Sequence, residues 1–144
     1  MPAPGPKDRA FQVIDVRDAA AFALRCAEEN FQGVWNVTGP VLRFCDALDA
    51  VATVAGSSPE WVWLSEDLIK DAGIEPWVDI PLMAPLDPRF RHVLEVSTAK
   101  ARAAGLVCRP LEETLGPLLA WDRERRAAAL QCGMTSAQEA ALLG

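Results

Sequence analysis

The sequence predicts an α/β fold in which short strands alternate with helices. Apolar residues recur at the three- and four-residue spacing of a helix in several stretches, and short apolar runs bounded by Gly, Pro or Asn lie between them. The 144 residues are enough for one domain with a sizeable core. We expect residues 1–10, which are rich in Pro and Gly, to form an N-terminal arm, and residues 11–144 to form a single α/β domain.

The first strand and helix are expected directly after the arm. Phe11–Val16 alternates imperfectly between apolar and polar residues, which is typical of a short strand. We expect Asp18 to cap the following helix, whose apolar stripe has helical spacing. The stripe consists of Ala19, Phe22, Ala23, Cys26 and Ala27. The stretch GVWNVTGP, residues 33–40, is then expected to be a strand between turn signals.

The middle of the sequence contains two further helices and one strand. Leu42–Ala55 has helical periodicity, and Gly56 is expected to end this helix. The stretch WVWL, Trp61–Leu64, predicts a short strand. Ser65 is expected to cap the next helix, which Gly73 closes.

Prolines exclude regular structure between residues 74 and 91, because proline fixes φ and has no backbone N–H. These prolines are Pro76, Pro81, Pro85 and Pro88. We expect an ordered loop that lies over another part of the domain.

The C-terminal third is expected to return to regular structure. It predicts a strand at Val93–Val96 and a helix that Ser97 caps and Gly105 ends. A longer helix follows, with a buried stripe at Leu111, Leu115, Leu118 and Trp121. Near the end, Ser136–Glu139 matches a capping box and predicts a short terminal helix.

Composition excludes several classes of protein. The net charge of −6 argues against nucleic-acid binding, which needs clustered Lys and Arg. No apolar run approaches the roughly 18 residues that a membrane span needs, and the N-terminal MPAPGP lacks the apolar stretch of a signal peptide. We therefore expect a soluble, cytoplasmic protein with no membrane partner.

The cysteines do not predict a metal site. Zinc ligands come in closely spaced pairs, whereas this sequence has no Cys-x-x-Cys and a single histidine, His92. The four cysteines are Cys26, Cys45, Cys108 and Cys132. Reduced thiols that pack as small apolar side chains are the expected state.

Four stretches occur in an order and spacing that resemble a known family. They are FQVIDVRDAAAFALRCAEEN, GVWNVTGP, AGIEPWVDIPL and STAKARAAGLVCRPLEETLGPLLAWDR. They resemble the C-terminal half of the NAD-dependent epimerase/dehydratase family, which belongs to the extended short-chain dehydrogenases/reductases, and are closest to its reductase-like bacterial members. The resemblance covers nearly the whole chain. It implies the substrate-side portion of that fold, without the Rossmann nucleotide-binding half.

The resemblance also implies what this chain lacks. Members of the family bind NAD or NADP through an N-terminal Rossmann half that carries a Gly-rich loop and a catalytic Tyr-x-x-x-Lys pair. This sequence contains no tyrosine and no strand followed by a Gly-rich loop. We therefore expect no catalytic and no cofactor-binding residue in this chain, and no NAD(P) binding or hydride transfer by the chain alone.

The Pro-rich segment is the predicted substrate pocket, as the resemblance implies. Trp77, Met83 and Phe90 would form apolar walls. In nucleotide-sugar members of the family an arginine close to the Arg91 position contacts a phosphate, and a guanidinium suits a phosphate or carboxylate. Arg9, in the arm, is a further candidate for an anion contact. The expected substrate is small and anionic or apolar; the alternative is that Trp77 packs in the core and the arginines are solvated.

Other polar residues have a structural interpretation. Asp15 and Asp18 suit a strand-to-helix corner. Glu112 and Glu113 lie in the first turn of a predicted helix, where the helix dipole favours acidic side chains, and Arg109 is their expected local partner. Solvated caps are therefore preferred over general acid or base residues.

Three functions remain open at this level. The chain could be a substrate-side half that needs a Rossmann-half partner. It could instead be a repurposed small-molecule-binding module, or a non-redox isomerase or cyclase of secondary metabolism. The third alternative is an oligomeric structural or interaction protein. In the resembled fold Val34–Val37 is the strand that adds to the Rossmann sheet, and this chain lacks that sheet, so we expect a homo-oligomer or a complex rather than a monomer.

Overall fold

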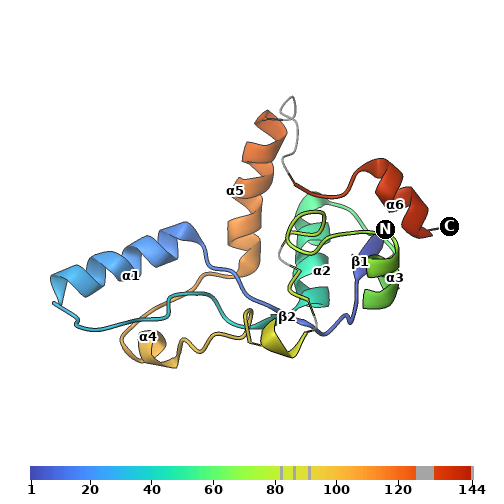
Figure 1. Cartoon of the computed structure of the whole chain (residues 1–144). Coiled ribbons are helices and arrows are strands. Elements are labelled where there is room, and N and C mark those ends of the chain that lie inside the picture. Colours follow the sequence, from blue (N-terminus) through green and yellow to red (C-terminus); the bar gives the residue numbers. More distant parts are fainter. Residues whose placement is uncertain (82, 86, 91, 126–131, 144) are drawn as a thin grey trace.

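The fold, described for residues 1–81, 83–85, 87–90, 92–125 and 132–143 of a computed structural model, is mixed α/β (Figure 1). The helices are α1 (Val16–Glu28), α2 (Phe44–Ala55), α3 (Glu66–Asp71), α4 (Ala99–Ala103), α5 (Leu111–Glu124) and α6 (Ser136–Leu143). The strands are β1 (Pro2–Pro4), β2 (Ala10–Phe11), β3 (Leu42–Arg43) and β4 (Val62–Leu64). The α/β class predicted from the sequence is confirmed at this level.

The strands form two separate pairs. β1 is parallel to β4, with Pro2 opposite Val62, and β2 is antiparallel to β3, with Ala10 opposite Arg43. The expectation of an irregular arm is therefore wrong for Pro2–Pro4. Proline carbonyls still accept hydrogen bonds, so two prolines are tolerated in a strand at the edge of a sheet.

The first helix begins earlier than the sequence predicted. Asp15, rather than Asp18, is its N-cap, and the Asp15 carboxylate accepts a hydrogen bond from the Arg17 backbone N–H at 2.8 Å. Of the predicted strand over Phe11–Val16, only Phe11 lies in a strand, as the second residue of β2. Asp18 lies inside the first turn, where its side chain is free to pair with another element.

Local signals for helix ends are confirmed at Ser65 and Gly56, but the prediction that Ser97 caps α4 is wrong, because its N-cap is Thr98. The Ser65 hydroxyl accepts from the Leu68 N–H at 3.2 Å, and Gly56 ends α2 in the left-handed conformation with φ 68°. The terminal capping box is displaced by one residue. Thr135 and Gln138 form it instead. Gln138 Oε1 accepts from the Thr135 N–H at 2.8 Å, and the Thr135 hydroxyl accepts from the Gln138 N–H.

Two predicted strands are absent from the described residues. Residues 33–40 belong to neither sheet, and residues 93–96 contain a turn in place of a strand. Both predictions are wrong for the same reason: a strand exists only when a second strand pairs with its backbone, and none of the described strands pairs with these segments.

The apolar core is divided into two clusters. One joins β4, α3, the Pro-rich segment and α6, and consists of Leu64, Ile69, Ile74, Ile80, Met83 and Leu142. The other joins α1, α4 and residues 31–41 around Phe22, Ala101 and Leu106. The two clusters lie at opposite ends of the molecule, with α2 and α5 between them (Figure 1). The predicted stripe of α1 is only partly buried, since Ala23 and Ala27 face solvent.

Gln12 connects segments that no strand pairing connects. Its side chain is buried, and its amide nitrogen donates to the carbonyls of Gly39 and Val96, each at 2.9 Å. Its amide oxygen accepts from the Val96 N–H at 2.9 Å. One side chain therefore holds the chain before α4 against the chain before β3, in the way a strand backbone would.

Replacing Gln12 gives the first testable prediction. Gln12→Ala should lower the free energy of unfolding by roughly 2–4 kcal/mol, because it leaves a backbone N–H and two carbonyls without partners. Urea denaturation measures the change. Gln32→Ala is the matched control: that side chain is exposed and, among the described residues, bonds only to Asn30, so its effect should stay within about 0.5 kcal/mol. Equal effects of the two variants would contradict the role assigned to Gln12.

Candidate functional site

A hollow of about 430 Å³ lies where the chain before β2 meets the Pro-rich segment. Its walls are mostly apolar, with Arg9 and Asp87 as the charged residues among those described. The lining consists of Arg9, Ala10, Ala84, Pro85, Asp87, Pro88, Phe90 and Leu94. An apolar hollow with few polar groups is the usual form of a small-molecule site.

The structure brings together only some of the five residues predicted for the pocket. Arg9 and Phe90 line the hollow. Met83 is 1% exposed and lies in the apolar cluster beneath the Pro-rich segment. Trp77 is 43% exposed, is not among the residues that line the hollow, and has a positive φ of 69°. Arg91 lies outside the described residues.

Arg9 fixes the Pro-rich segment against the N-terminal part of the chain. Its Nη2 donates to the Ala84 carbonyl at 2.6 Å, and its Nη1 is buried without a hydrogen-bond partner among the described residues. Burial lowers the pKa of Arg9, while the nearby Glu66 carboxylate opposes that shift. The guanidinium is thus partly desolvated and has donor capacity that no described protein atom uses.

Arg89 compensates the negative charge of Asp87 at the rim of the hollow. The Arg89 side chain bonds to the carboxylate through Nη2 at 2.7 Å, and the Arg89 N–H donates to the same group at 2.8 Å. These hydrogen bonds lower the pKa of Asp87 to about 2. Sequence reasoning missed Asp87 and Leu94, although Asp-Pro-Arg is a turn signal that places Asp87 beside Arg89.

The described lining of the hollow offers groups for recognising a ligand. None of the described lining residues is a Ser, Cys, Lys or His that could act as a nucleophile or base. Arg9 offers hydrogen-bond donors and Phe90 offers an apolar face. The described residues likewise contain no group of three or more His, Cys, Asp or Glu that could bind a metal ion.

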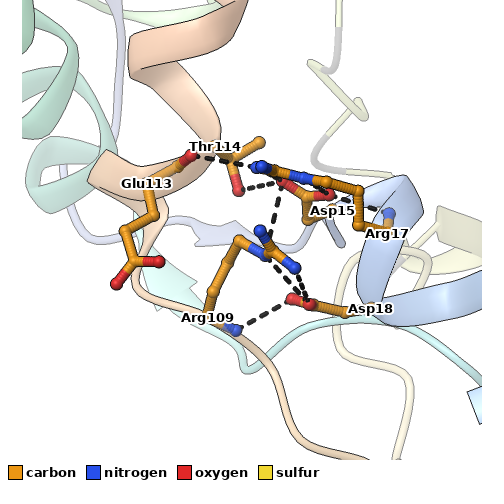
Figure 2. Close-up of polar contacts among 6 residues, drawn as sticks. All are labelled: Asp15, Arg17, Asp18, Arg109, Glu113 and Thr114. Atoms are coloured by element: carbon orange, nitrogen blue, oxygen red, sulfur yellow. Dashed lines mark hydrogen bonds and ion pairs between the residues drawn. The ribbon is translucent and has the colours of Figure 1, made fainter. Parts of the chain in front are cut away.

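A second polar centre joins the N-termini of α1 and α5 (Figure 2). Arg109 reaches Asp18 through Nη2 at 2.6 Å and Nε at 2.9 Å, and its own N–H donates to the same carboxylate at 2.8 Å. Asp15 accepts from the Arg17 side chain at 2.6 Å and from the Thr114 hydroxyl at 2.9 Å. The expected local pairing of Arg109 with Glu112 and Glu113 is therefore wrong, because Arg109 crosses to α1.

The two carboxylates of this centre are held in the ionised form. Both aspartates are buried, and hydrogen bonds from Arg17 to Asp15 and from Arg109 to Asp18 hold their pKa values below the usual range. A carboxylate with a depressed pKa and occupied oxygens is a poor general acid or base at neutral pH. The structural interpretation of Asp15 and Asp18 agrees with this geometry.

Comparisons with known proteins return no match: no family model, no curated protein and no solved structure is similar to this chain. Among the described residues, no helix has both the length and the apolar character needed to cross a membrane.

From the ion pair between Asp18 and Arg109 we predict that the protein loses stability at acidic pH. Because folding depresses the pKa of Asp15 and Asp18, the stability that these carboxylates contribute is present above their unfolded pKa of about 4 and is lost as pH falls below it. Arg109→Gln should lower the free energy of unfolding at pH 7 and flatten its decline between pH 5 and pH 2. Urea denaturation across this range measures both effects.

Arg123→Gln is the control for this experiment. Arg123 is an exposed residue of α5 outside the polar centre, so its variant should keep the wild-type pH profile. A profile for Arg109→Gln that runs parallel to the wild type would show that these aspartates do not depend on Arg109.

Proposed function

We propose that this chain is the substrate-binding half of an NAD(P)-dependent enzyme of the epimerase/dehydratase type. A nucleotide-binding half would supply the dinucleotide site and the Tyr-x-x-x-Lys pair, and hydride transfer would need both. Two observations support the proposal: the four stretches that resemble the family, and an unpaired strand-like segment. The last of these carries the most weight.

The unpaired segment is Val34–Val37. Trp35 anchors it to α1 and α4, since its ring lies edge-on to Phe22 of α1 with centroids 5.9 Å apart and lies 3.9 Å from Lys100 Nζ of α4. Lys100 also donates to the Val34 carbonyl at 2.8 Å. Val34 itself is 86% exposed, and residues 33–40 make no strand pairing. One side of the segment is fixed and the other is exposed to solvent, as expected for a strand whose neighbouring strand belongs to another protein chain.

The outer face of α1 is apolar in the same region of the fold. Its members follow helical spacing at i, i+4, i+7, i+8 and i+11, and all are exposed. They are Val16, Ala20, Ala23, Leu24 and Ala27. This exposed face lies next to the buried side of the helix that carries Phe22, so a partner that pairs with Val34–Val37 would have a second surface to bury.

The total exposed area agrees with a missing partner. A compact monomer of 15.6 kDa exposes about 7,200 Å², whereas this chain exposes 9492 Å². The excess of roughly 2,300 Å² is well above the about 800 Å² that each partner buries in a standard interface. A complex would therefore bury surface that this chain alone leaves exposed.

The experiment examines the protein as it is isolated from its producing cell. Native mass spectrometry should detect this chain bound to a nucleotide-binding half that carries the Gly-rich loop and Tyr-x-x-x-Lys, together with NAD or NADP. Calorimetric titration of the isolated chain with either dinucleotide should give no heat of binding up to about 1 mM, because no phosphate-binding loop is present.

The interface variant is Val34→Asp, which should abolish the complex because a charge would enter the strand edge. Val78→Asp is the control, since Val78 is an exposed valine (52%) on the Pro-rich segment and should leave the complex intact. Micromolar dinucleotide binding by the isolated chain, or a complex that tolerates Val34→Asp, would refute the proposal.

A second candidate function is small-molecule binding without redox chemistry. One observation favours it: the hollow beside Arg9 and Phe90 is lined within this chain, so a ligand could bind there without a partner. Such a module would recognise a small ligand with an apolar body and an anionic or hydrogen-bond-accepting group.

Benzoate and inorganic phosphate are suitable probes for this hollow. Benzoate should shift the backbone NMR signals of Ala10 and Leu94, and Arg9→Gln should weaken binding at least about tenfold, the lower end expected for a charge-assisted hydrogen bond. Lys7→Gln, an exposed neighbour, should change nothing. Shifts with phosphate alone would indicate an anion site without apolar selection, and no shift with either probe would exclude this function.

A further inference from the structure

A hollow of about 270 Å³ lies between α4 and the chain that follows this helix, at one end of the molecule (Figure 1). Most of the residues that line it are apolar, and Arg102 is the one charged residue among the described lining. The lining consists of Pro40, Thr98, Arg102, Leu106, Val107 and Cys108. None of these residues lines the hollow beside Arg9 and Phe90, so the two hollows are separate.

The Thr98 hydroxyl is a polar group of this hollow that the fold does not use. Thr98 is the N-cap of α4, a position at which a threonine side chain ordinarily accepts a hydrogen bond from the first turn of the helix. Here it makes no capping hydrogen bond, and no other described residue bonds to the hydroxyl, although Thr98 is only 8% exposed. Since a buried hydroxyl normally has a partner, a ligand in the hollow would supply the one that is lacking.

Arg102 is an arginine without an acidic partner among the described residues. It lies one helical turn after Thr98, because its N–H donates to the Thr98 carbonyl at 2.9 Å, so both side chains are on the same face of α4. Six other arginines are paired with a carboxylate: Arg17, Arg25, Arg43, Arg89, Arg109 and Arg125. The guanidinium of Arg102 is therefore available to an anion.

The surroundings of the hollow are basic, although the whole chain has a net charge of −6. Residues 96–111 contain three basic residues and no Asp or Glu. Asp18, whose charge reaches Cys108, is already paired with Arg109 at 2.6 Å. Cys108 is neutral at neutral pH, because burial, and to a smaller extent the charge of Asp18, raise the pKa of its thiol. An anion in the hollow would thus meet a guanidinium and a neutral thiol.

We propose that this hollow binds a small aliphatic carboxylate. The Arg102 guanidinium would bind the carboxylate, which it matches in shape and charge, and the Thr98 hydroxyl would donate to one of the carboxylate oxygens. The aliphatic tail would lie against Leu106 and Val107. One guanidinium suits one negative charge, and about 270 Å³ has room for an acid of about four or five carbons, because a cavity of about 150 Å³ holds benzene.

The site does not depend on the proposed function. It is formed within this chain, contains no residue of the Val34–Val37 segment and needs no nucleotide-binding half. The isolated chain can therefore be tested by itself, and failure of this site would leave the proposed function untouched.

Residue-resolved NMR of the full chain with butyrate tests the proposal. Butyrate should shift the backbone signals of Thr98 and Val107 with a Kd of about 1 mM, as expected for a small ligand with one charge-assisted contact. Butylamine, which has a tail of the same length and a positive charge at neutral pH, should leave these signals unchanged. Shifts confined to Ala10 and Leu94 would place butyrate in the hollow beside Arg9 and would contradict the proposal.

Two variants test the roles of the polar groups. Arg102→Gln should weaken butyrate binding at least about tenfold, and Thr98→Val, which keeps the shape of the side chain, should weaken it severalfold. Neither change removes a capping hydrogen bond or an ion pair among the described residues, so both variants should keep the wild-type circular dichroism.

Arg123→Gln on α5 is the matched control and should keep the wild-type affinity for butyrate. This helix is largely exposed, since even Leu118 and Trp121 of its expected buried stripe are 51% and 53% exposed, and none of its residues lines the hollow. No shift at about 10 mM butyrate, ten times the expected Kd, equal shifts with butylamine, or wild-type affinity of Arg102→Gln would overturn the carboxylate site.

Discussion

The ion pair between Arg109 and Asp18 is the interaction on which the rest of the arrangement depends. α1 packs its apolar side into one cluster, around Phe22 and Leu106, whereas the other cluster lies beyond α2 and α5. Arg109 joins α1 to the start of α5, because it precedes α5 and bonds to the first turn of α1 over a sequence separation of 91 residues. Since the Asp18 carboxylate is buried, removing Arg109 would leave a charge without a partner, and this is more costly than losing an exposed pair. The direction of α1 is therefore fixed by this ion pair together with the packing of Phe22 against Leu106.

This arrangement explains why the open surfaces are where they are. With α1 held at its N-terminus and Trp35 fixed against it by the ring of Phe22 at 5.9 Å, Val34 is left facing solvent. Arg9 organises the other end, where its bond to Ala84 closes the Pro-rich segment over the N-terminal part of the chain. The substrate-side function that we propose needs both features: a hollow formed by this chain and an edge that a nucleotide-binding half could extend.

Local signals in the sequence predicted local structure well. Ser65 and Gly56 mark a helix start and a helix end because their effect depends only on neighbouring backbone groups. The strand predictions at residues 33–40 and 93–96 failed because strand pairing depends on a distant partner. The partner of Arg109 was also beyond sequence reasoning, since nothing near Arg109 in the sequence indicates Asp18. Of the predicted pocket residues, Arg9 and Phe90 line the hollow, and Met83 is buried in the apolar core because an unbranched apolar side chain fills the core.

Amide hydrogen exchange at Val34–Val37 tests the central claim most directly. Apart from side-chain contacts, the segment has no strand pairing in the described part of the chain. The account therefore predicts that the amides of Val34, Asn36 and Val37 exchange within seconds in the isolated chain, while amides in the middle of α2 are protected. In the complex with a nucleotide-binding half, the same amides should become protected by strand pairing. Strong protection at Val34–Val37 in the isolated chain under conditions where it is a monomer would contradict the account, because the segment would then already have its strand partner.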